Sequence, residues 1–180
     1  KELVENALDA GATRVDVVVR DGGQSFISVA DDGNGMTAAE LALAVERHAT
    51  SKLPDDDLTR IDTFGFRGEA LPSIGAVARL TLASRARGAA EAWTLTVEGG
   101  RADRPRPAAQ GTGTRVEVKD LFFATPARLK FLKTARTEFA HFEETVSRLA
   151  LANPRVAFSL SNGEKEIFRL HDRGALRANT

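Results

Sequence analysis

The stretch TRVDVVVRDGGQSFISVAD (residues 13–31) has the pattern of two strands joined by a short turn. Val15, Val17 and Val19 stand at every second position, which is the spacing of a strand that buries one face. Gly22-Gly23 supplies a turn, and residues 24–31 continue as a second strand. We therefore expect a β-hairpin over this stretch.

A helix is expected before this hairpin. On a wheel of about 100° per residue, the apolar residues of the segment gather on one side: Leu3, Val4, Ala7, Leu8 and Ala10. The other side carries the polar residues Glu2, Glu5, Asn6 and Asp9. Gly11 is expected to end the helix. The polar side is either a solvated surface or a row of groups aimed into a site.

The rest of the chain alternates helices and strands without a repeated parallel strand–helix–strand unit. We expect helices at residues 37–49, 70–77 and 137–153, the first with a capping box of Thr37 and Glu40. Further strands are expected at residues 78–85, 91–99, 114–122, 156–162 and 165–170, and irregular segments at residues 50–68 and 101–110. This order predicts an α+β two-layer sandwich, a mixed sheet with helices on one face.

The composition is that of one globular domain. The chain has 180 residues, of which 42% are hydrophobic and 28% charged, and its 25 basic residues balance 25 acidic ones. Net charge therefore favours neither nucleic acid nor an anionic membrane as a partner. The absence of cysteine excludes disulfides and cysteine-ligated zinc, and His48, His141 and His171 form no metal motif. With no export signal or long apolar run, we expect a cytoplasmic location and no membrane contact.

Two stretches carry groups suited to chemistry on a ligand: one to the activation of water, the other to the recognition of a ligand amino group. Glu2 and Asn6 are four residues apart, so a carboxylate that polarises water would lie one turn from an amide oxygen that suits Mg²⁺. In DDGNG (residues 31–35), Asp31 can accept a hydrogen bond from a ligand amino group, while Gly33 and Gly35 allow close backbone approach. Each stretch taken alone also fits a plainer interpretation, a solvated helix face and a glycine turn.

Two later stretches suit phosphate and a pocket wall. In FGFRGEAL (residues 64–71), glycines flank Arg67 just before a helix, an arrangement that favours phosphate binding but also describes a tight loop with a surface arginine. In GTGTRVEV (residues 111–118), Thr114 either points its hydroxyl into a pocket or simply begins a strand.

In this order, these four stretches resemble the ATP-site motifs of the GHKL superfamily, which includes type II topoisomerases, heat-shock chaperones, sensor histidine kinases and MutL mismatch-repair proteins. Within it, GFRGEAL, RHATSK (residues 47–52) and FFATPARLKFL (residues 122–132) resemble MutL. The resemblance implies the Bergerat ATP-binding fold. It also implies an ATPase domain over residues 1–170, truncated at its N-terminus, with residues 171–180 beginning a connection to a following domain.

The resemblance also implies residue roles. Glu2 is the general base that activates water, Asn6 binds Mg²⁺, and Asp31 reads the adenine amino group with Gly33 and Gly35 shaping the pocket. Residues from about 47 to 71 form an ATP lid, and the expected phosphate-side residues are Lys52, Phe66, Arg67, Gly68, Glu69, Ala70 and Leu71. Thr114 lies near the adenine ring. Asp32 stands where MutL sequences often have asparagine, a difference expected to be tolerated, and Glu5 is assigned no catalysis.

By the same resemblance, ATP binding orders the lid and brings two chains together as a homodimer, and slow Mg²⁺-dependent hydrolysis releases them. A segment before Lys1 and a lysine from a following domain take part in the family, so we expect weak activity from these 180 residues alone. Alternatives are another GHKL ATPase, such as a topoisomerase-like protein or a histidine kinase, and a non-catalytic nucleotide-binding interaction module. GFRGEAL argues against the first and intact Glu2 and Asn6 against the second.

The expected partners are DNA and proteins of mismatch recognition and repair, in a bacterial-type cytoplasm at the nucleoid. Four basic residues after Pro126 form a cluster without an acidic residue among them: Arg128, Lys130, Lys133 and Arg136. Such a cluster either contacts DNA phosphates without reading the bases or is a solvated loop and helix start.

Overall fold

The computed structural model describes residues 1–46 and 69–172. The irregular segment expected at residues 50–68, the end of the helix expected over 37–49, and residues 173–180 of the expected connection lie outside them.

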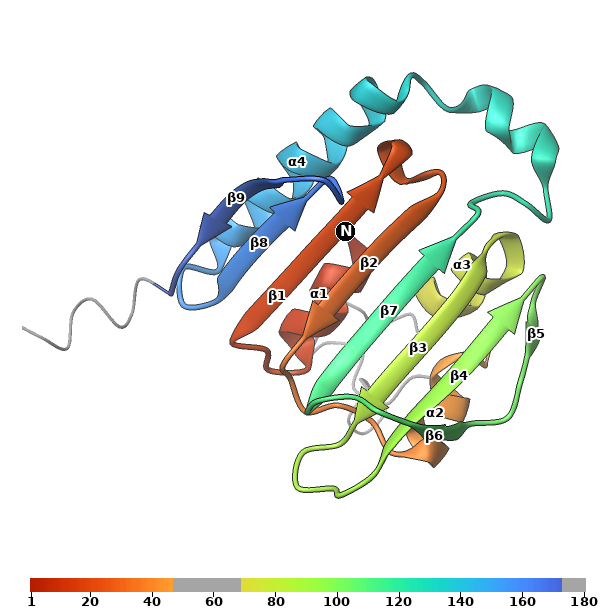
Figure 1. The fold of residues 1–180 in the computed structure, drawn as a ribbon, viewed down its shortest axis with the longest axis vertical. Helices are drawn as coiled ribbons and strands as arrows, with labels where there is room; N and C mark the ends of the chain where they lie inside the picture. The colour runs from red at the N-terminus through yellow and green to blue at the C-terminus, as the bar shows by residue number, and fades with distance from the viewer. Residues whose placement is uncertain (47–68, 173–180) are drawn as a thin grey trace, which may run out of the picture.

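Nine strands of the described residues form one sheet, in the order β5-β4-β3-β7-β2-β1-β8-β9 with β6 beside β4 (Figure 1). The strands are β1 (Arg14–Arg20), β2 (Phe26–Asp31), β3 (Arg79–Arg85), β4 (Ala92–Glu98), β5 (Arg101–Ala102), β6 (Arg106–Ala108), β7 (Gly113–Lys119), β8 (Ala157–Ser161) and β9 (Glu166–Leu170). Among the described pairs, β1 and β8 run parallel and the others antiparallel. The expected mixed sheet is confirmed.

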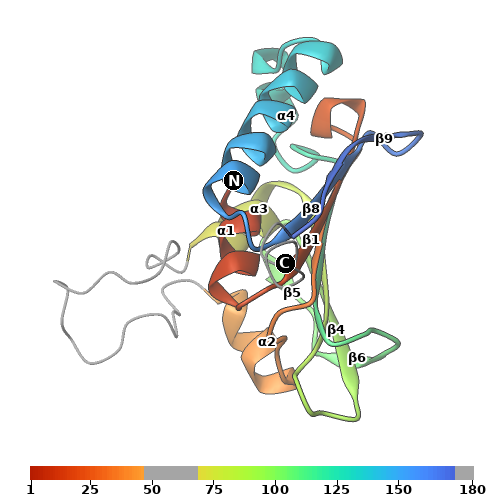
Figure 2. The same ribbon diagram turned by 90° about the vertical axis from the view of Figure 1, so that its left-hand side faces the viewer.

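The α-helices lie on one face of this sheet (Figure 2). They are α1 (Glu2–Asp9), α2 (Ala38–Ala44), α3 (Ala70–Val77) and α4 (Ala135–Ala152), and two 3₁₀ helices, η1 (Asp21–Gly23) and η2 (Pro126–Phe131), lie in connections. The expected α+β two-layer sandwich with helices on one face is therefore confirmed.

The hairpin predicted from residues 13–31 is present. β1 and β2 pair antiparallel with Val17 opposite Val29, and η1 forms the turn between them. Every second residue of β1 is buried, as its valine spacing predicts, and joins an apolar cluster beneath α1 and α4. A second cluster beneath α2 and α3 is built on β3, β4 and β7, and Leu3 of α1 packs against both.

The largest differences from the predicted elements lie in three places. α2 ends at Ala44, because the Glu46 N–H bonds to the Leu43 carbonyl three residues back and closes the helix as a tight turn. β7 ends at Lys119 rather than residue 122, since Asp120 has a φ of 50° that no strand can continue. The segment at residues 101–110 contains β5 and β6, which pair with β4 and cover its edge.

Candidate nucleotide-binding site

The C-terminal end of α1 is held against the DDGNG loop. The Asn34 N–H donates a hydrogen bond of 2.8 Å to the Ala10 carbonyl, and a Cβ atom on Gly33 would lie 2.8 Å from that same oxygen. Glu2 begins α1 and is exposed, while Asn6, one turn further on, is half-buried. The loop therefore fixes the helix that carries the expected base and the expected Mg²⁺ ligand.

The polar side of α1 is not uniformly solvated. Glu5, expected on the polar side with Glu2 and Asn6, is only 5% exposed, and its carboxylate forms an ion pair with the Lys1 ammonium at 3.0 Å. Helical spacing alone could not show this, because burial depends on the sheet beneath the helix. Glu5 therefore has a packing role in α1.

Asp31 is the last residue of β2, and one of its two carboxylate oxygens is hydrogen-bonded to backbone N–H groups. Its Oδ1 accepts hydrogen bonds from the Gly33 N–H at 2.9 Å and the Thr114 N–H at 3.3 Å. Its Oδ2 has no hydrogen-bond partner among residues 1–46 and 69–172. Burial raises the pKa of Asp31 above the usual aspartate value, and the two backbone hydrogen bonds oppose that rise in part. The geometry leaves one oriented acceptor for a ligand.

Two glycines allow three strand ends to meet at this point. Gly35 has a φ of 66°, and a Cβ atom there would collide with the carbonyl oxygen of Arg85 at the end of β3. Gly113 has a φ of 107°, and its Cβ would collide with the carbonyl oxygen of Asp31. The end of β2, the end of β3 and the start of β7 are thereby brought into backbone contact.

Ser84, which lies outside the four sequence motifs, links these strand ends. Ser84 is fully buried on β3, and its hydroxyl lies within hydrogen-bond distance of Met36, Gly113 and Thr114. A signal was present in the sequence, because Ser84 continues the buried alternation of Leu80 and Leu82 with a polar residue. A buried hydroxyl needs partners, so a serine at such a position indicates a local hydrogen-bond network.

The expected phosphate-side residues are only partly described. Lys52, Phe66, Arg67 and Gly68 lie outside the described residues. Glu69 is the N-cap of α3, Ala70 is the first residue of that helix, and Leu71 packs against the apolar cluster on β3, β4 and β7. The last two residues of the motif thus begin the helix.

The basic cluster lies at the other end of the sheet. Arg128 and Lys130 are on η2, Lys133 follows it, and Arg136 is the second residue of α4. All four are exposed. Figure 1 shows η2 beyond the end of β7, opposite to the end where β7 starts and β2 finishes. The end of β2 with the start of β7, and η2 with its basic residues, therefore lie toward opposite ends of the sheet.

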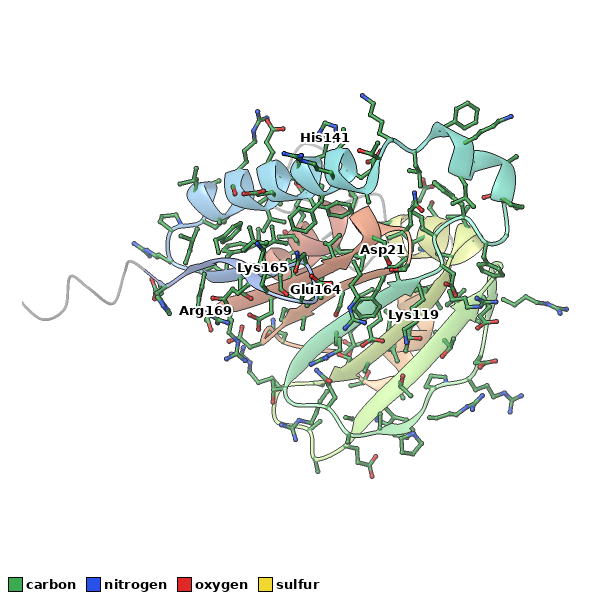
Figure 3. The ribbon with its side chains drawn as sticks, turned by 45° about the horizontal axis from the view of Figure 1, so that its top comes forward. Asp21, Lys119, His141, Glu164, Lys165 and Arg169 are labelled. Carbon is green, nitrogen blue, oxygen red and sulfur yellow. The ribbon has the colours of Figure 1, made fainter. Side chains whose placement is uncertain are left out.

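The donor set at α1 fits a magnesium ion shared with phosphates. The described residues contain no group of three or more His, Cys, Asp or Glu side chains able to hold a metal by themselves. His141 is exposed on α4, which lies away from the end of the sheet where β2 finishes (Figure 3). A single protein oxygen such as that of Asn6, completed by phosphate and water oxygens, matches how Mg²⁺ is usually bound.

No helix within residues 1–46 and 69–172 combines the length and the apolar character that crossing a membrane requires.

Comparisons with known proteins show the family of the chain. The family described as "Histidine kinase-, DNA gyrase B-, and HSP90-like ATPase" matches residues 1–120. The DNA mismatch repair protein MutL of Paramagnetospirillum magneticum is 66% identical over 170 residues, which are 94% of this chain and 28% of that protein. MutL of Rhodospirillum rubrum is 65% identical over 170 residues, 94% of this chain and 27% of that protein.

Solved structures give the same result. The "Aquifex aeolicus MutL ATPase domain complexed with ADP" superposes with a TM-score of 0.78 at 35% identity, over 95% of this chain and 61% of that one. The chain spans little more than a quarter of the length of the two MutL proteins compared above. The chain belongs to the histidine kinase-, DNA gyrase B- and HSP90-like ATPase family, and within that family it is similar to the ATPase domain of MutL.

Proposed function

We propose that this chain is the ATP-binding and ATP-hydrolysing switch domain of a MutL-type DNA mismatch repair protein. The observation that carries the proposal is the meeting of α1, the DDGNG loop and the start of β7 around one half-satisfied carboxylate, Asp31. The similarity to an ATPase domain solved with ADP supports it. We propose residues 1–170 as the extent of the domain, since β9, the last strand among the described residues, ends at Leu170.

The base of the nucleotide is held at the strand ends. Asp31 Oδ2, which has no hydrogen-bond partner among the described residues, is assigned as the acceptor for the adenine amino group. Thr114 stands at the start of the neighbouring strand β7, where its N–H donates to Asp31 Oδ1, so this residue adjoins the carboxylate. Gly33 and Gly35 let the loop pass close to Ala10 and to the Arg85 backbone, where a Cβ atom would collide, and so hold the loop beside Asp31. The ionised carboxylate is the stronger acceptor, so the raised pKa of Asp31 means that acid weakens this hydrogen bond at a higher pH than it would for an ordinary aspartate.

Hydrolysis is assigned to α1. Glu2 acts as general base toward the water that attacks the γ-phosphate, and Asn6 supplies one oxygen to Mg²⁺. When bound, Mg²⁺ would neutralise part of the negative charge of the phosphates. The remaining phosphate contacts are assigned to Lys52 and to residues 66–71. The exposure of Glu2 agrees with a carboxylate that must reach a water.

In the full-length protein, the bound nucleotide (ATP, or the product of its hydrolysis) controls which partners the domain binds. ATP binding favours a homodimer, and hydrolysis releases it. The basic cluster of Arg128, Lys130, Lys133 and Arg136 contacts DNA phosphates without reading sequence, which suits a repair protein that acts at the nucleoid in the cytoplasm. Mismatch-recognition and other repair proteins are the expected protein partners.

Replacement of Glu2 tests the catalytic assignment. In the full-length protein, Glu2→Gln keeps the shape of the side chain but removes the base, so kcat for ATP hydrolysis should fall at least about 100-fold. The affinity for ATP, measured by equilibrium titration, should stay within about threefold because the base does not bind adenine.

The matched control is Glu143→Gln, an exposed glutamate on α4, which should leave both quantities unchanged. Hydrolysis that persists in Glu2→Gln would remove Glu2 as the base. Binding without hydrolysis in the unchanged protein would favour a non-catalytic nucleotide-binding module.

A further inference from the structure

We propose that Ser84 is a positioning residue that sets the direction of the Thr114 hydroxyl hydrogen, so that the pocket offers a donor beside the Asp31 acceptor and thereby selects adenine. This inference rests on the proposed ATP-binding function and deepens it. It concerns a side chain that no ATP-site motif contains.

The hydroxyl of Ser84 stands between three polar groups in a fully buried position. The Met36 N–H donates to Ser84 Oγ at 2.8 Å. Ser84 Oγ lies 3.0 Å from the carbonyl oxygen of Gly113 and 2.8 Å from Thr114 Oγ1. Since Thr114 is only 8% exposed, water does not freely replace these partners.

The number of hydrogens limits this network to two arrangements. A serine hydroxyl has one hydrogen and two lone pairs, and Met36 occupies one lone pair. In the first arrangement Ser84 donates to the Gly113 carbonyl and accepts from Thr114, whose hydroxyl then presents only lone pairs. In the second arrangement, Ser84 donates to Thr114 Oγ1, and the Thr114 hydroxyl can then donate its own hydrogen bond to a ligand.

Only the second arrangement complements adenine. The Thr114 N–H donates to Asp31 Oδ1 at 3.3 Å, so the threonine and the carboxylate are neighbours where β2 ends and β7 begins. The Watson–Crick edge of adenine places an amino donor beside the N1 acceptor, which requires an acceptor from Asp31 and a donor from Thr114. Guanine would place its O6 acceptor against the Asp31 carboxylate. Adenine binding therefore selects the state in which Ser84 donates to Thr114.

The test compares ADP with 1-deaza-ADP, in which a C–H replaces the N1 acceptor. In the full-length protein, calorimetric titration should show that ADP binds about tenfold more tightly, the value of one buried hydrogen bond. In Ser84→Ala the Thr114 hydroxyl loses its orienting donor, so this ratio should fall toward one. A merely structural role would weaken both ligands equally and leave the ratio unchanged.

Further variants keep the outcome decisive. Ser28→Ala removes another buried serine of the same sheet, on β2, and should leave the ratio unchanged. Thr114→Val should collapse the ratio as Ser84→Ala does, and the double variant should show no further loss. Ser84→Cys keeps the volume with a weaker donor and should give an intermediate ratio, which serves if Ser84→Ala does not fold.

The failures are distinguishable. If the unchanged protein binds ADP and discriminates against 1-deaza-ADP, but Ser84→Ala or Ser84→Cys discriminates equally well, the role of Ser84 is overturned and the proposed function stands. If the unchanged protein does not bind ADP, the proposed function fails and this inference fails with it.

Discussion

At the scale of single residues, two adjacent aspartates acquire opposite properties from their surroundings. Burial raises the pKa of Asp31. Burial acts in the same direction on Asp32, but hydrogen bonds from Thr13 and Arg14 outweigh it and lower the pKa of Asp32. Asp31 can therefore accept a further hydrogen bond from a ligand, whereas both carboxylate oxygens of Asp32 already accept hydrogen bonds from Thr13 and Arg14.

Asp32 ties the DDGNG loop to the start of β1. Its Oδ1 accepts from the N–H groups of Thr13 at 2.7 Å and Arg14 at 2.8 Å, and its Oδ2 accepts from the Thr13 hydroxyl at 2.6 Å. An asparagine can keep all three bonds, because its amide oxygen accepts both N–H groups and its NH₂ donates to the Thr13 hydroxyl. This geometry supports the expectation that asparagine is tolerated at this position.

We expect Asp32→Asn to change the free energy of unfolding by less than about 1 kcal/mol near neutral pH, and Asp32→Ala to lower it by about 1 kcal/mol or more. Denaturant unfolding measures both. Because the folded pKa of Asp32 lies below its unfolded value, its stabilisation is complete above the unfolded pKa and disappears as pH falls through the folded pKa. Asp32→Asn should lack this acid-dependent loss, and an unaltered pH profile would contradict the assignment.

At the scale of elements, α2 shows how a local signal can decide a helix start. The capping box predicted from Thr37 and Glu40 is present: Thr37 Oγ1 accepts from the Glu40 N–H at 3.3 Å, and Glu40 Oε2 accepts from the Thr37 N–H at 2.8 Å. These bonds from Thr37 lower the pKa of Glu40. α2 has only seven residues, so its stability depends on this cap and on the fully buried Leu41.

Loss of the cap should loosen α2 selectively. Thr37→Ala is expected to lower helix stability by about 1 kcal/mol, which hydrogen exchange at the Glu40 and Leu41 amides would show as faster opening. Thr37→Ser retains the hydroxyl and should behave as the unchanged chain. Equal protection in Thr37→Ala would show that packing of Leu41 alone holds the helix.

At the scale of the whole molecule, the sheet separates two surfaces. The strand ends around Asp31 form the proposed nucleotide site, and η2 with the start of α4 carries the basic cluster beyond the opposite end (Figure 1). The basic side chains of η2 lie beside exposed apolar groups, with Lys130 Nζ 5.5 Å from the centre of the Phe131 ring. Phe131 is 77% exposed, so the ring is accessible along with the charge.

Charge reversal tests this second surface. In the full-length protein, Lys130→Glu with Lys133→Glu should weaken binding to DNA duplexes of any sequence. It should also reduce the slope of log affinity against log salt by roughly two, since each phosphate contact contributes about 0.9. The matched control reverses Arg101 and Arg104, exposed residues near β5. Unchanged affinity and slope in the lysine variant would exclude this surface from DNA binding.

The sequence by itself determined the elements whose signals are local. The valine spacing of β1, the Gly22-Gly23 turn and the capping box of α2 each depend on neighbours within a few residues, and each is present as predicted. The order of the ATP-site motifs also indicated the family, because several separate motifs in one order identify it jointly. The ends of β7 and α2 were less predictable, since they depend on backbone turns that propensity does not fix.

Only the tertiary structure decided which polar groups are buried together. The local pattern around Glu5 does not separate it from solvated positions, and the alternation along β3 indicates that Ser84 is buried but not which groups it contacts. The pairing of β3 with β7 places Ser84 opposite Thr114, and packing on the sheet buries Glu5 against Lys1. These contacts join residues by strand register and helix packing, which are properties of the whole sheet, and the partners of Ser84 are therefore set by the fold.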